Sequence, residues 1–269
     1  MTAHQRIRIR HTKLGRTKYL SARDLTSVWE RSLRRAALPI AYSEGFTPHA
    51  KVSFPDALPV GIASTGEYAE LSFAAPIDPG PGLGRLSAAL PEGLDITTYL
   101  VVPDNAPKLA RMLGATLWEL AWPLDDQPDD LPHRLEACVR AFLAADTVEV
   151  VKRRPSGDKV VDVRPPVVAA AVSTTAPRSW LRAATPTSAP PDGATLVLRT
   201  VLRNGGATVR PPDLQAALAA VAPDGVDPPP TTRHSCRVAQ GHVVDAGIKE
   251  ALTGAVEPLS TTITDADAA

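Results

Sequence analysis

The hydrophobic pattern of the first hundred residues predicts alternating strands and helices. In RIRIRHTK, residues 6–13, apolar and charged positions alternate, so a strand should bury Ile7 and Ile9 on one face and turn its arginines outward. From residue 22 to residue 37 apolar positions recur every three or four residues, which predicts an amphipathic helix that Pro39 ends. Further elements are expected as a strand within residues 41–61, strands at 67–73 and 94–102, and a helix at 83–90.

The order of these elements is strand, helix, strand, strand, helix, strand, the order of a ferredoxin-like unit. The second half repeats this order without obvious residue identity. Its expected elements are strands at 115–124, 147–154, 159–173, 194–203 and 232–239 and helices at 131–145 and 212–222. We therefore predict an α+β protein in which two ferredoxin-like βαββαβ halves pack in tandem. A single larger α+β sheet is the alternative.

These patterns divide the chain into three parts. Residues 1–108 should form an N-terminal ferredoxin-like half with a basic face and a long loop, and residues 109–240 a C-terminal ferredoxin-like half. Residues 241–269 should form a flexible, disordered C-terminal tail, because their end, STTITDADAA, has little apolar content.

The connection AYSEGFTPHAKVSFPDALPVG, residues 41–61, is much longer than the few residues that join most elements. Tyr42 and Phe46 offer flat faces for stacking, and Gly45 lets the backbone approach a ligand closely or adopt a positive φ. His49 and Lys51 add polar and cationic contacts. The alternative is structural, with the aromatic side chains filling the edge of the core.

Charge is unevenly distributed, although the whole chain is neutral. Residues 1–54 hold eleven Lys or Arg against three Asp or Glu, a net charge of +8, whereas residues 240–269 carry a net charge of −4. A basic front attracts polyanions. It could also be an ordinary solvated face that acids from elsewhere neutralise.

Cations beside aromatic side chains on a small sheet are typical of proteins that bind single-stranded RNA. A second basic segment, KRRPSGDKVVDVRP, begins at residue 152 and could equally be a solvated hairpin. The candidate residues for binding RNA or a partner are Arg8, Arg10, Lys13, Arg16, Tyr42, Ser43, Gly45, Phe46, His49, Lys51, Arg154, Lys159 and Arg164.

Signatures of catalysis and of metal binding are missing from the sequence. It has no P-loop, no HExxH and no clustered Cys and His with metal-ligand spacing, so we expect neither a catalytic residue nor a metal site. His49 alone is a weak candidate for an acid or base. Cys138 and Cys236 are far apart and should be buried and reduced, as in a cytoplasmic protein. No apolar run is long enough to span a membrane.

Four segments resemble the bacterial radical-SAM-linked (radical-SAM-associated) family, a domain of unknown function. They are RIRHTKLGRTKYLSARDL, RRAALPIAYSEGFTPHAKVSFPDALPVGIASTGEY, KVVDVRP and LRNGGATVRPPDL. The resemblance covers roughly residues 5–240. The sequence departs from the family pattern at Glu44, where a Gln is common, and at Ala50, where a proline is usual.

The resemblance implies a separate radical S-adenosylmethionine protein as partner. That partner would hold the iron–sulfur cluster and the S-adenosylmethionine, which fits the absence of cluster cysteines in this chain. We therefore expect an accessory RNA-binding domain that works with the radical SAM protein in RNA modification or processing. The alternative is a protein–protein scaffold for the same partner without RNA, and a third, weaker reading is an enzyme that uses His49.

Overall fold

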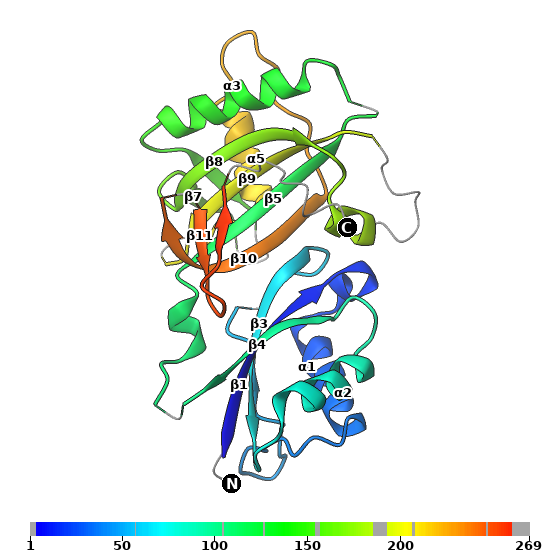
Figure 1. Cartoon of the computed structure of the whole chain (residues 1–269). Helices are drawn as coiled ribbons and strands as arrows, with labels where there is room; N and C mark the ends of the chain where they lie inside the picture. Colours follow the sequence, from blue (N-terminus) through cyan, green and yellow to red (C-terminus); the bar gives the residue numbers. More distant parts are fainter. Residues whose placement is uncertain are drawn as a thin grey trace.

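The computed structural model describes residues 4–56, 58–103, 105–125, 127–153, 157–184, 193–205, 208–245 and 247–259. Figure 1 shows two lobes joined end to end. The strands are β1 (Gln5–Lys13), β2 (Val52–Ser53), β3 (Ala63–Phe73), β4 (Ile96–Val102), β5 (Ala115–Pro123), β6 (Glu149–Lys152), β7 (Lys159–Asp162), β8 (Val167–Thr175), β9 (Thr195–Arg203), β10 (His234–Val244), β11 (Gly247–Glu250) and β12 (Val256–Pro258). The helices are α1 (Ala22–Arg35), α2 (Pro79–Ala89), α3 (Leu131–Ala144), α4 (Ser179–Ala184) and α5 (Pro211–Ala220), with short 3-10 turns η1 (Gly15–Tyr19) and η2 (Leu109–Met112).

The first lobe contains β1 to β4 with α1 and α2. Its strands run in the order β4-β1-β3, β2 pairs with the other side of β3, and all these pairings are antiparallel. Ile7 and Ile9 face α1 and α2 and pack in one core cluster with Trp29 and Leu71. α1 begins where the Ser21 hydroxyl accepts a hydrogen bond from the backbone N–H of Asp24 (3.2 Å), as its capping sequence suggests.

The second lobe contains β5 to β10. Its strands run β10-β5-β9-β8, again all antiparallel, while β6 and β7 form a separate two-stranded hairpin. α3 and α5 cover one face of this sheet, where Trp122, Leu135 and Phe142 belong to the largest core cluster.

A short seam joins the two lobes into one sheet. β3 and β10 pair in parallel at only two positions, Ala63 with Cys236 and Ser64 with Arg237. Beyond them the strands cross closely at Gly66, where a Cβ atom would lie 2.4 Å from the carbonyl oxygen of Val238. The described chain is thus a mixed α/β protein with one large, ten-stranded sheet and five α-helices. The continuous sheet agrees with the larger-sheet alternative.

Residues 241–259 were expected to belong to a flexible tail, and this expectation is wrong. They complete β10 and form β11 and β12, which pair with one another and with β10. Ile248 is fully buried beside Leu117 and Ala239, so the segment covers the sheet face opposite α3 and α5. Residues 260–269 lie outside the described part of the chain.

Two further details differ from the sequence prediction. The strand expected at 159–173 is two strands, β7 and β8, interrupted by the proline pair at 165 and 166. α4 was not predicted, because six residues are too few for a helical period to be recognised.

Cys138 and Cys236 are buried and unbridged. None of the helices in the described residues is long and apolar enough to cross a membrane.

Candidate functional site

The first half of the long connection folds into a hairpin, residues 41–51. Two backbone bonds close it, from Lys51 N–H to the Ala41 carbonyl (2.7 Å) and from Ser43 N–H to the His49 carbonyl (2.8 Å). The Ser43 hydroxyl accepts a third bond from His49 N–H (3.0 Å). Ala41 N–H also donates to the carbonyl of Ser72 on β3, so the base of the hairpin is fixed to the sheet.

The tip of this hairpin carries the most exposed aromatic side chain of the described residues. Phe46 is fully exposed, and Tyr42 is 37% exposed. Gly45 turns the chain with φ +134°, a conformation that residues with a Cβ rarely adopt. The hairpin lies along α1, because His49 Nδ1 is 3.7 Å from Glu30 Oε1.

The helix α1, which the hairpin contacts at Glu30, carries three exposed arginines. Arg34 follows Glu30 by one helical turn and therefore lies on the same face. Arg31 and Arg35 are also exposed. All three arginines belong to the basic front of residues 1–54. They are not among the predicted site residues, because the contact between His49 and Glu30 cannot be predicted from helical spacing.

The expectation that β1 presents a basic outer face is wrong. Arg8 is 1% exposed, and its Nε lies 2.8 Å from Glu70 Oε2. Arg10 donates to the carbonyls of Thr65 and Val238 and pairs with Glu257. The alternation itself is correct, but η2 and the β11–β12 hairpin cover this face.

Lys13 and Arg16 differ in their exposure to solvent. Lys13 is buried and its Nζ donates to the Leu20 carbonyl (3.0 Å), whereas Arg16 is exposed. Of the four cations predicted on the first strand and the segment after it, only Arg16 on η1 is exposed, and the hairpin adds the partly buried Lys51.

The second basic segment lies in the other lobe, so the structure does not bring it to the hairpin. Lys159 is exposed on β7. Arg164 donates to the carbonyls of Val167 and Leu143 and stacks over the Phe142 ring (5.7 Å). Arg154 lies outside the described residues.

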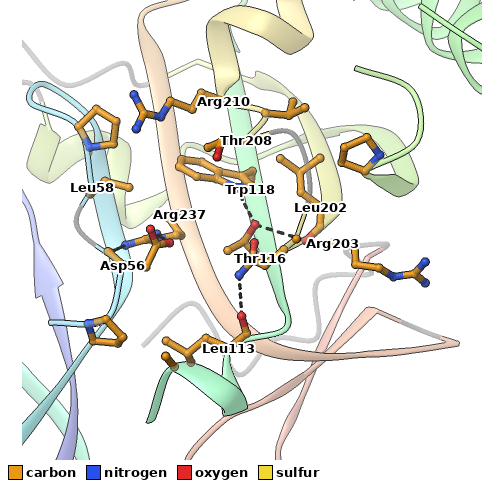
Figure 2. Close-up of a pocket in the computed structure, with 17 residues that line it drawn as sticks. Asp56, Leu58, Leu113, Thr116, Trp118, Leu202, Arg203, Thr208, Arg210 and Arg237 are labelled. Carbon is orange, nitrogen blue, oxygen red and sulfur yellow. Dashed lines mark hydrogen bonds and ion pairs between the residues drawn. The ribbon is translucent and has the colours of Figure 1, made fainter. Parts of the chain in front are cut away.

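A cavity of about 290 Å³ lies between the lobes. Figure 2 shows its lining, which comes from the end of the long connection, the segment around β5, the loop after β9, and β10. Leu58, Leu113, Trp118 and Leu202 supply apolar walls. Pro55 and Leu58 of the long connection thus line one cavity with Leu202 and Asn204 of the motif LRNGGATVRPPDL, although the two segments are about 150 residues apart.

Arg237 forms the floor of the cavity and holds the lobes together. Its guanidinium is buried, donates to both carboxylate oxygens of Glu67 (2.7 Å each) and also contacts Asp56. Burial alone would raise the pKa of Glu67, but the charge and hydrogen bonds of Arg237, together with His11 and Ser64, outweigh burial, and the pKa is lowered. The arginine also lies 5.9 Å from the Trp118 ring centre.

The rim of the cavity is polar. Asn204 Nδ2 donates to the Leu113 carbonyl (2.6 Å), and Trp118 Nε1 donates to the Thr116 hydroxyl (2.9 Å). Arg203 and Arg210 are exposed lining residues. In Figure 2 Arg210 extends toward the side of Leu58, whereas Arg203 extends away from the cavity.

No sequence pattern predicted this site. The motif LRNGGATVRPPDL was noticed only as part of a resemblance, and Arg237 stands in a strand with no distinguishing pattern. As for metals, the described ranges hold no group of three or more His, Cys, Asp or Glu side chains suited to bind one.

Comparison with known proteins identifies a family. Residues 6–211 match the model of a family described as "Uncharacterized protein conserved in bacteria (DUF2344)". A search of the curated proteins found no match.

Proposed function

The chain belongs to this family of uncharacterized bacterial proteins, DUF2344, and we propose that it is an accessory subunit that docks on a radical SAM protein through the hairpin at residues 41–51. The resemblance to radical-SAM-linked proteins supplies the class of partner. In this proposal the partner holds the iron–sulfur cluster and S-adenosylmethionine. This chain binds the partner through the hairpin and so fixes its position.

The observation that carries the proposal is the full exposure of Phe46 on an ordered hairpin. An exposed aromatic ring gains free energy when a partner covers it, and aromatic residues are frequent among the few that dominate binding. The hydrogen bonds across the hairpin fix the backbone beforehand, so docking loses little conformational entropy.

RNA binding is the second candidate, and the exposed arginines Arg31, Arg34 and Arg35 of α1, of which Arg34 shares the helix face of Glu30, favour it. Stacking on Phe46 with cations near the backbone would suit a single strand. It is the weaker candidate, because Arg8, Arg10 and Lys13 already have partners inside the protein.

We also infer that the two lobes are ferredoxin-like units in tandem. The strand orders β4-β1-β3-β2 and β10-β5-β9-β8 support this inference. Numbered along the chain within each lobe, the strands lie side by side in the same order, which is fourth, first, third and second. The β6–β7 hairpin is then an insertion in the second unit. Superposing the lobes in a crystal structure should align four strands and two helices, and a failure to align them would contradict the inference.

The docking proposal is tested by purifying the tagged chain from its native cells, with and without nuclease. We expect a radical SAM protein to be recovered under both conditions, and Phe46→Ala to lose most of it. Tyr19→Ala is the matched control, because Tyr19 is also an exposed aromatic residue of the first lobe but lies outside the hairpin.

Each outcome decides between the candidates. Recovery of the radical SAM protein that nuclease abolishes would favour RNA binding. Recovery of no radical SAM protein, or equal recovery with Phe46→Ala and wild type, would contradict docking through the hairpin.

A further inference from the structure

The cavity between the lobes has the composition of a small-molecule site. Apolar and aromatic walls with a few polar groups are typical of ligand pockets, and about 290 Å³ is near the small end of their range. The Trp118 indole provides an aromatic wall whose N–H already binds Thr116, so its orientation is fixed. A cavity of this size has room for one flat ring system and little more.

Charged groups in the cavity are separated in space. At the floor, Arg237 is matched by Glu67 and Asp56, and half of the Asp56 side chain remains exposed, so its carboxylate can accept hydrogen bonds. At the rim, the guanidinium of Arg210 takes part in none of the ion pairs found among the described residues. The floor thus suits a donor such as an amino group, and the rim suits an anion.

The start of α5, which also lies at the rim, does not supply the anion site. The carboxylate of Asp213 accepts from the Arg210 backbone N–H (2.8 Å) and pairs with Lys152 (2.7 Å), so it already satisfies the helix N-terminus. Recognition of an anion therefore depends on the Arg210 side chain, which can bind a phosphate through two parallel hydrogen bonds.

We infer that this cavity binds a nucleotide, with the base between the apolar walls, its amino groups toward Asp56, and its phosphate at Arg210. The same chemistry can come from a free mononucleotide or from one nucleotide of an RNA strand. The inference is independent of the hairpin, which lies at a distance from the cavity on the first lobe.

Calorimetric titration of the full chain with AMP, CMP, GMP, UMP and inorganic phosphate tests the inference. At least one mononucleotide should bind with a Kd below about 1 mM, and inorganic phosphate at least tenfold more weakly. Arg210→Gln should weaken nucleotide binding at least tenfold. Arg203→Gln is the matched control, because it removes the same charge from the same rim on a side chain that extends away, and it should change Kd less than about twofold.

A second variant, Thr208→Trp, should obstruct the rim and abolish binding while the fold, checked by circular dichroism, is kept. A single-stranded RNA decamer distinguishes the two sources of the nucleotide. If the decamer binds more tightly than the mononucleotide and Arg210→Gln weakens its binding, the ligand is one nucleotide of a strand. If only the mononucleotide binds, the ligand is a free nucleotide. Phe46→Ala should leave these affinities unchanged. Binding of no nucleotide below 1 mM, phosphate binding as tight as nucleotide binding, or equal effects of Arg210→Gln and Arg203→Gln would overturn the inference.

Discussion

At the scale of single residues, buried charges decide where this protein is vulnerable. Arg237 and Glu67 are both almost completely buried and bind one another across the seam between β3 and β10. A buried pair adds little compared with an apolar pair of the same shape, but loss of one partner leaves an unpaired buried charge.

Glu67→Ala leaves the buried Arg237 with only the half-exposed Asp56 as its ionic partner, so the free energy of unfolding should fall by about 3 kcal/mol, the lower end of the range for breaking a buried pair. Urea denaturation at pH 7 measures it. Glu136→Ala is the control, since Glu136 pairs with Arg140 on the exposed side of α3, where such a pair contributes about 0.5 kcal/mol or less. Equal losses for the two variants would show that the Glu67 pair is not buried as described.

The same ion pair makes the free energy of unfolding depend on pH. The pKa of Glu67 is lower in the folded than in the unfolded protein, so the unfolded state binds more protons as pH falls. The stabilisation is complete above the usual glutamate pKa of 4.5 and is lost as pH falls through the lower folded value. Wild type should lose stability below about pH 4.5, and Glu67→Gln should lose less; parallel pH profiles from thermal unfolding would contradict this.

His11 should create a second pH dependence at a higher pH. Burial lowers its pKa below 6.5, although Glu67 opposes the shift, and its ring lies 5.0 Å from that of Trp29. Because the unfolded state takes up the proton first, stability should fall as pH drops below about 6.5, by at most about 1.4 kcal/mol per pH unit.

His11→Phe should remove much of this slope between pH 7 and pH 5, as followed by urea denaturation. His133→Gln is the control, because His133 is exposed on α3 and should leave the slope unchanged. A slope that persists undiminished in His11→Phe would exclude His11 as its cause.

At the scale of elements, α2 offers a clean test of helix propensity. A Cβ at Gly84 would meet nothing within 4 Å, whereas at Gly82 it would lie 2.9 Å from Ile77 Cδ1. Gly84→Ala should raise the free energy of unfolding by about 0.5–1 kcal/mol, and Gly82→Ala should gain less. Chemical denaturation of both variants checks this; an equal gain would mean that Ile77 yields without cost.

Local pattern predicted most elements because hydrophobic period is a local property. Alternation in β1 placed Ile7 and Ile9 correctly in the core, and the apolar periodicity of residues 22–37 predicted α1. The same pattern could not show which strand face meets water, since that depends on the distant η2 and on β11 and β12. Arg8 was therefore correctly placed opposite Ile7 and incorrectly placed on the surface.

At the scale of the whole molecule, the seam between the lobes is the feature that the sequence could not reveal. Two parallel pairs between β3 and β10 join residues about 170 positions apart, and neither strand carries a signal for the other. The cavity follows from the seam, because its walls come from both lobes.

Gly66→Ala should break this seam. Its Cβ would lie 2.4 Å from the Val238 carbonyl oxygen and 2.8 Å from Ala239 Cα, and these are backbone atoms that cannot move independently. We expect the free energy of unfolding, measured by urea denaturation, to fall by at least about 2 kcal/mol. Gly84→Ala, which should raise it, is the control. A neutral Gly66→Ala would show that the strands do not approach closely.

Docking of Phe46 on a radical SAM protein is tested by the affinity of that purified protein for the wild-type chain, Phe46→Ala and Tyr19→Ala, measured by calorimetry in the presence of nuclease. We expect Phe46→Ala to lose about 2 kcal/mol of binding free energy, or about thirtyfold in Kd, and Tyr19→Ala to change little. Equal affinity of wild type and Phe46→Ala would contradict docking through Phe46.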